Sequence, residues 1–165
     1  MVLHKEAERI CRQVGSKQDL MVCLYNQAEI LQTWGELDGA MALFKEQERT
    51  CRLMGYKDDL QTALSGQADV LKTRGDLVGA MELLREVEGV CRELGKPDDL
   101  AASLASQAEL LSRDLRRLRE ALPLAEEAYR LASDHGYVRR AQKVKPVLDS
   151  IRTKLREAAN PQVGD

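Results

Sequence analysis

The side chains that most often perform covalent or metal chemistry are scarce in this chain of 165 residues. It has two histidines, His4 and His135, near opposite ends, and four cysteines. A Ser-His-Asp or Cys-His set needs a histidine beside its nucleophile, and this supply offers none. Phosphate-binding loops and zinc-protease motifs are also missing from the sequence. The sequence therefore predicts a protein that is not an enzyme and needs no cofactor or metal.

Three of the cysteines, Cys11, Cys51 and Cys91, are separated by forty residues each. If forty residues form one structural repeat, equivalent helices lie about 8–10 Å apart. A disulfide needs Cα atoms within about 7 Å. Cys23 occupies a position where other repeats carry small residues, and no Cys-x-x-Cys pair suggests zinc. We therefore expect reduced cysteines, and we expect the oxidised and reduced proteins to melt alike.

Regularly spaced carboxylates offer a different chemistry, the binding of a cationic partner. Glu29, Asp69 and Glu109 are also separated by forty residues. The same period runs through the chain, because residues 16–55 and 56–95 are identical at nineteen of forty positions, and residues 1–15 match 41–55 at nine of fifteen. Self-similarity at this period predicts a helical solenoid.

Two helical patterns alternate within each unit. Leu20, Leu24, Ala28 and Leu31 follow the spacing of one helix face, and a glycine then ends the helix. The second pattern begins at Leu37 and also ends at a glycine. The patterns predict eight helices, at about residues 1–13, 17–33, 37–54, 57–73, 77–94, 97–113, 118–134 and 137–157.

The repeats predict one domain over residues 1–165. The first helix aligns with the second half of a unit, so the array begins with a partial repeat. Pro146 lies inside the last helix and is expected to kink or split it. The expected parts are a partial repeat 1–15, repeats 16–55, 56–95 and 96–136, a capping helix 137–157 and a tail 158–165.

The charge is close to balanced, at −2, but it is unevenly distributed. Residues 111–165 hold 12 Lys and Arg against 8 Asp and Glu. Few aromatic residues accompany these cations, so base stacking has little support and we do not expect a nucleic-acid partner. The candidate basic patch is Arg113, Arg116, Arg117, Arg119, Arg139, Arg140, Lys143 and Lys145.

No apolar run is long enough to span a membrane, and no secretory signal opens the chain. We therefore expect a cytoplasmic protein.

The pattern of the units resembles the tetratricopeptide repeat signature. The forty-residue length is similar to the long-repeat branch of Pins-type adaptors and kinesin light chains. The resemblance implies an all-α, right-handed α-solenoid of antiparallel helix pairs. It also implies a non-enzymatic scaffold that binds a peptide or protein segment. The residues that carry the resemblance are Leu24, Ala28, Leu31, Gly35, Leu37, Ala40 and Phe44.

One departure from the signature concerns three glutamines. Gln27, Gln67 and Gln107 stand where the family usually has an apolar core residue. Buried amides need hydrogen-bond partners. They could form a structural ladder along the array, or they could face a ligand.

In the family that the chain resembles, the first helix of each pair lines the concave groove. Helix geometry then selects the side chains that point into the groove, and its acidic row favours a basic segment. The alternative is a self-associating array without a separate ligand, in which the stripe of Leu3, Ala7, Ile10 and Val14 recruits a second copy. The predicted groove residues are Val22, Tyr25, Glu29, Gln32, Thr62, Ser65, Asp69, Lys72, Ala102, Ala105, Glu109 and Ser112.

Overall fold

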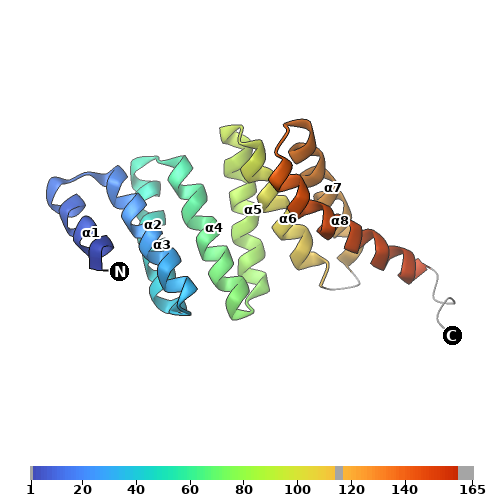
Figure 1. The fold of residues 1–165 in the computed structure, drawn as a ribbon, viewed down its shortest axis with the longest axis horizontal. Helices are drawn as coiled ribbons and strands as arrows, with labels where there is room; N and C mark the ends of the chain where they lie inside the picture. Colours follow the sequence, from blue (N-terminus) through green and yellow to red (C-terminus); the bar gives the residue numbers. More distant parts are fainter. Residues whose placement is uncertain (1, 114–116, 160–165) are drawn as a thin grey trace. The chain divides into compact units, whose positions relative to one another are not determined.

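The computed structural model describes residues 2–113 and 117–159, with side chains described in these ranges except at residues 2–5 and 7. These residues form eight α-helices and no strand (Figure 1). The all-α prediction is confirmed, and each helix begins and ends within two residues of its predicted bounds. The helices are α1 (Val2–Val14), α2 (Lys17–Thr33), α3 (Leu37–Met54), α4 (Lys57–Arg74), α5 (Leu77–Leu94), α6 (Pro97–Leu111), α7 (Leu118–Asp134) and α8 (Val138–Ala159).

The chain divides into two compact units. Unit 1 covers residues 1–83 and unit 2 covers residues 84–165, so α5 spans the division. In unit 1, α1 packs on α2, α2 on α3 and α3 on α4, and α2 also contacts α4. In unit 2, α6 packs on α7 and α7 on α8, and α6 also contacts α8. Contacts between neighbouring hairpins are typical of a repeat protein. The single repeat domain with its six parts stays a prediction.

Glycines end the helices because the chain turns there through a left-handed conformation. Gly35 and Gly75 have φ values of 80° and 83°, which residues with a Cβ rarely adopt. The N–H of Gly35 donates to the carbonyl of Gln32 at 3.0 Å, and the N–H of Glu36 donates to that of Leu31 at 2.8 Å. This pair of bonds satisfies carbonyls that the helix end leaves free. The next helix therefore starts at once in the opposite direction.

Acidic and hydroxyl side chains cap two helix starts. The Oγ of Ser16 accepts a hydrogen bond from the N–H of Asp19 at 3.4 Å. The carboxylate of Asp76 accepts one from the N–H of Gly79 at 3.0 Å. Each bond satisfies an N–H that has no partner within its helix. The caps fix where α2 and α5 begin.

Small residues lie where helices approach each other. Two sets of alanines that recur from repeat to repeat are fully buried, and their small side chains allow neighbouring helices to approach closely. In unit 1 the ring of Phe44 is also fully buried, and it packs where α4 carries Gly66. A Cβ at that glycine would lie 2.4 Å from two ring carbons of Phe44. The alanines are Ala28, Ala68, Ala108, Ala40, Ala80 and Ala121.

The core of unit 1 contains one buried carbonyl without a partner. Gln47 is 1% exposed, and its Oε1 has no hydrogen-bond partner among the described residues. Val87 holds the equivalent position in the next repeat. An unpaired buried polar group costs about 1–3 kcal/mol. We expect Gln47→Met to raise the free energy of unfolding by about 1 kcal/mol in urea titrations.

A matched control for Gln47→Met is Gln67→Met, which removes a partnered amide and should have the opposite sign. A Gln47→Met protein that is less stable than wild type would show that this carbonyl contributes to stability.

The last helix is unbroken and longer than predicted. Pro146 does not split α8, which runs without a break from Val138 to Ala159. A proline in a helix removes one backbone hydrogen bond, and the buried stripe of Val144, Leu148 and Ile151 holds both halves on the same unit. The helix also continues two residues beyond the predicted end at 157. Residues 160–165 of the predicted tail lie outside the described residues.

Candidate functional site

The part of the predicted groove in unit 1 lies on α2 and α4, two helices in direct contact. Val22, Glu29 and Asp69 are exposed, and the other five predicted residues are half-buried. Two exposed carboxylates therefore stand on a surface that also offers half-buried apolar and polar groups. The half-buried set is Tyr25, Gln32, Thr62, Ser65 and Lys72.

Tyr25 is the centre of this surface. Its ring packs against Phe44 with centroids 6.1 Å apart and planes tilted by 57°. Burial raises the pKa of its phenol, and a hydrogen bond to Glu29 and the negative charges of Glu29 and Asp69 raise that pKa further. The structure therefore brings both acids of unit 1 close to one aromatic anchor, and the phenol remains a neutral donor at physiological pH.

The two acids of unit 1 differ in their neighbours. Asp69 forms an ion pair with Lys72, another predicted groove residue. Glu29 forms no ion pair with a Lys or Arg among the described residues, and it accepts a hydrogen bond from the Tyr25 hydroxyl. Its charge is therefore the less neutralised of the two.

Some predicted groove hydroxyls are already engaged by their own helices. Thr62 Oγ1 donates to the carbonyl of Asp58 at 3.2 Å, and Ser112 Oγ donates to that of Glu109 at 2.8 Å. Such bonds to the preceding turn are common for serine and threonine in helices. These hydroxyls can still accept a hydrogen bond from a ligand, but they cannot donate one to it while they donate to their own helices.

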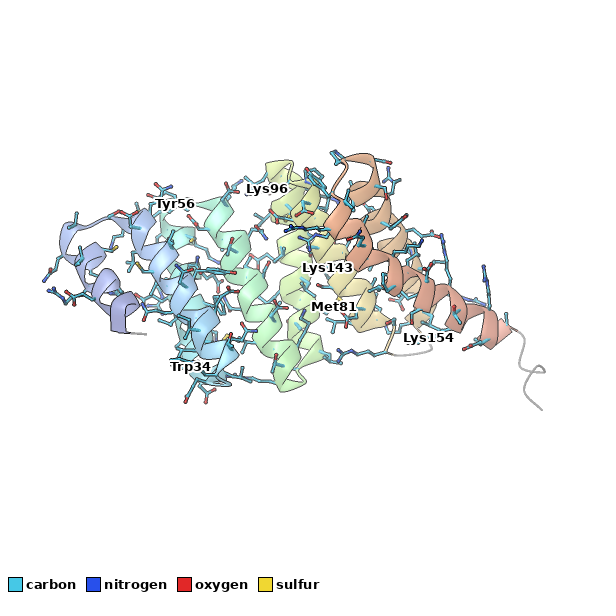
Figure 2. All side chains as sticks on the ribbon, viewed as in Figure 1. Trp34, Tyr56, Met81, Lys96, Lys143 and Lys154 are labelled. Atoms are coloured by element: carbon cyan, nitrogen blue, oxygen red, sulfur yellow. The ribbon has the colours of Figure 1, made fainter. Side chains whose placement is uncertain are left out.

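The predicted row in unit 2 lies on α6. Ala102, Ala105 and Ser112 are half-buried, and Glu109 is exposed. Glu109 pairs with Arg113 at 3.9 Å, a contact between two exposed side chains. The carbonyl of Ser112 accepts a hydrogen bond from Lys154 Nζ of α8 at 3.0 Å (Figure 2). This row has no aromatic residue, so it lacks the aromatic anchor that Tyr25 provides in unit 1.

The three glutamines have partners, and these partners are glutamates of the preceding helix. The Nε2 atoms of Gln27, Gln67 and Gln107 donate to glutamate Oε2 atoms at 2.7, 2.6 and 2.7 Å. The other oxygen of each glutamate pairs with an arginine one helical turn later. We call these three sets the polar triads. They are Arg12–Glu8–Gln27, Arg52–Glu48–Gln67 and Arg92–Glu88–Gln107.

The triads favour the structural interpretation of the glutamines, with a glutamate between helices in place of a ladder of amides. In the first triad, Glu8, Arg12 and Gln27 also line a cavity of about 520 Å³, with Leu31, Gly39, Ala42 and Leu43 among its apolar walls. Sequence reasoning missed the glutamates, although Glu8, Glu48 and Glu88 show the same forty-residue period.

Several cations of the candidate basic patch are neutralised. Arg140 makes two parallel hydrogen bonds to Asp98, at 3.0 and 3.1 Å. These bonds outweigh burial and hold the pKa of Asp98 below its usual value. Arg117 pairs with Glu120, and Arg116 lies outside the described residues. Lys143, which Figure 2 labels on α8, lines a cavity of about 440 Å³ with Tyr137, Asp98 and Arg140.

The four cysteines are free thiols, but two of them are neighbours. The sulfurs of Cys11 and Cys23 lie 3.8 Å apart between α1 and α2. Cys11 and Cys23 occupy different positions of the repeat, so the forty-residue spacing does not predict that they meet. Also on α1, Ile10 and Val14 are 47% and 75% exposed. Leu3 and Ala7, the rest of the predicted stripe, have side chains outside the described residues.

The described part of the chain offers neither a metal site nor a membrane span. No group of three His, Cys, Asp or Glu side chains there is placed to hold a metal ion. No helix there combines the length and apolar character needed to cross a membrane.

No family model and no curated protein matches the sequence. Solved structures do match. A Podosopora anserina protein assigned as a kinesin light chain, with nearly identical TPR-like repeats, superposes with a TM-score of 0.63 at 16% identity, covering 98% of this chain and 87% of that one. A point variant of it gives 0.64 at 15% identity, covering 94% and 86%. At such identities the likeness concerns the fold alone. It confirms that this chain has a TPR-like helical repeat fold.

Proposed function

We propose that the chain is a non-enzymatic scaffold that binds an extended, basic peptide or protein segment on the α2–α4 surface. The observation that carries the proposal is the convergence of Glu29 and Asp69 on the half-buried Tyr25. An aromatic anchor with adjacent carboxylates suits a cationic side chain, which can pack on the ring and pair with an acid. The TPR-like fold supports an interaction role, because such repeats form extended binding surfaces.

The neighbours of the acids suggest which one contributes most. A ligand cation has to compete with Lys72 for Asp69 and with Arg113 for Glu109. At Glu29 it has to compete only with the Tyr25 hydroxyl. We therefore expect the largest loss of affinity at Glu29 when each acid is replaced by its amide.

The test begins with peptides selected from a random-sequence display library on the wild-type protein. We expect Lys and Arg to be enriched in them. Removing all three charges should weaken their binding about tenfold at low salt, since each exposed pair contributes up to about 1 kcal/mol. The loss should shrink as salt screens the charges. Fluorescence anisotropy measures both effects for the variant Glu29→Gln, Asp69→Asn, Glu109→Gln.

The matched control changes three exposed acids outside the predicted row and so alters the net charge equally. If the selected peptides bind the row variant and the control alike, the acidic surface is not the site. If no peptide is enriched and the protein forms oligomers in light scattering, the alternative of a self-associating array is favoured, with Ile10 and Val14 as its exposed apolar residues. The control is Glu36→Gln, Glu82→Gln, Asp134→Asn.

A further inference from the structure

The closest pair of thiols in the described part of the chain joins two packed helices. Cys11 on α1 and Cys23 on α2 have sulfurs 3.8 Å apart, and α1 packs directly on α2. Both side chains are partly exposed. By contrast, Cys51 is buried with its sulfur 3.6 Å from that of Met21, and Cys91 is fully buried. Cys11 and Cys23 therefore differ from Cys51 and Cys91 in two ways: their sulfurs lie close together, and their side chains are partly exposed to solvent.

The separation between the two sulfurs is close to a van der Waals contact. A disulfide bond is about 2.05 Å long, so the sulfurs have to approach by less than about 2 Å. Rotation about the two Cα–Cβ bonds changes the distance between the sulfurs, and any remainder requires a small shift of α1 on α2. Partial exposure allows a small reagent to reach the sulfurs, which Cys51 and Cys91 do not allow.

We propose that Cys11 and Cys23 are a modification site that forms a reversible disulfide by exchange with a small-molecule disulfide such as oxidised glutathione. The thiolate of one cysteine attacks the small disulfide, which forms a mixed disulfide and releases one small thiolate. The thiolate of the other cysteine then attacks the protein sulfur of the mixed disulfide and releases the second. Two protein thiols lose two protons and two electrons, and the small disulfide is reduced to two thiols.

The environment of Cys23 favours a slow, regulated reaction. Burial raises the pKa of Cys23, and its contact with Cys11 and the negative charges of Cys11, Glu8 and Asp19 raise it further. The thiolate is the reactive form, so most Cys23 stays protonated at neutral pH. In a reducing compartment the pair would remain dithiol and would respond to an oxidising change.

The bond would fasten α1 to α2. It closes the loop between residues 11 and 23, and closure of a loop of this size makes opening rarer by about tenfold to a hundredfold. The amides of α1 should then exchange with deuterium more slowly by that factor in the oxidised protein. This inference is independent of the proposed ligand surface. It reverses the sequence-based expectation that the oxidised and reduced proteins melt alike.

The experiment equilibrates the full chain with mixtures of oxidised and reduced glutathione, alkylates the free thiols, and measures intact mass and linked peptides. We expect a monomer that carries two fewer alkyl groups than the fully reduced and alkylated protein, with the Cys11 peptide linked to the Cys23 peptide. Cys11→Ala and Cys23→Ala should each abolish this species. Cys51→Ala is the matched control and should retain it.

Three results would overturn the proposal. One is the absence of the linked peptide from wild-type protein in the most oxidising mixture. Another is a disulfide that joins two chains or involves Cys51 or Cys91. The third is an unchanged exchange rate in α1 when the link is present. Since mapping is done first on wild-type protein, a variant that fails to fold does not affect the result.

Discussion

Gly66→Ala is expected to lower the free energy of unfolding by about 2 kcal/mol, although alanine is the better helix former. In the interior of a helix, alanine gains about 1 kcal/mol over glycine. At this position, however, the new Cβ would lie 2.4 Å from two ring carbons of Phe44. The ring is fully buried among Ala28, Ala40 and Val70. Overpacking of this severity costs about 3 kcal/mol, so the clash outweighs the gain.

Urea unfolding followed by circular dichroism measures this loss, and the chain supplies a matched control. A Cβ at Gly89, also inside a helix, would meet no atom within 4 Å. Gly89→Ala should therefore stabilise by about 0.5–1 kcal/mol. The next repeat places Leu84 at the position of Phe44, so Phe44→Leu should recover at least about 1 kcal/mol in the Gly66→Ala background. Additive effects of the two changes would contradict the clash.

Gln67→Met is expected to lower the free energy of unfolding by about 2 kcal/mol, because it removes a hydrogen bond to a charged group. Gln67 is 4% exposed, and its amide lies 2.6 Å from Glu48. Methionine keeps the length of the side chain, so the loss of packing is small. Chemical unfolding measures the change. A stability equal to that of wild type would mean that the triad contributes to specificity and not to stability.

The same triad predicts a pH dependence. Burial alone would raise the pKa of Glu48, but hydrogen bonds from Gln67 and Arg52 and the charges of Arg52 and Lys45 hold it below its usual value. A carboxylate with a lowered folded pKa stabilises the protein above its unfolded pKa of about 4.3 and loses that contribution as pH falls through the folded pKa. The stability difference between wild type and Glu48→Gln, measured by urea unfolding, should therefore shrink as pH falls below about 4.3 and be smallest once pH lies below the folded pKa of Glu48.

The repeat made the fold predictable in detail. Leu24, Ala28 and Leu31 recur with the period of a helix face, and the glycine after each helix marks a left-handed turn. Hydrophobic spacing and helix ends are local properties, so a single sequence contains them. α6 ends at Leu111, two residues before its predicted end, where the repeat pattern also changes.

Contacts between helices were harder to predict, because they depend on which side chains meet across an interface. The period showed that Gln67 and Glu48 recur, but not that an amide of one helix reaches a carboxylate of the previous one. Cys11 and Cys23 occupy different positions of the repeat, so no comparison of equivalent residues could pair them. The ion pairs of the acidic row were not predicted either. Lys72 was expected to contact a ligand, but it pairs with Asp69.

The polar triads also define where this array can be lengthened. Each triad joins the second helix of one repeat to the first helix of the next, and the same three residue types recur at a spacing of forty residues. An extra copy of residues 56–95 would therefore bring both halves of the joint with it. At the last joint, Tyr129 and Leu148 replace the glutamate and the glutamine. A copy of residues 56–95 inserted at that joint would place its glutamine opposite Tyr129, which offers no carboxylate, so the triad chemistry is available at the three inner joints and absent at the last one.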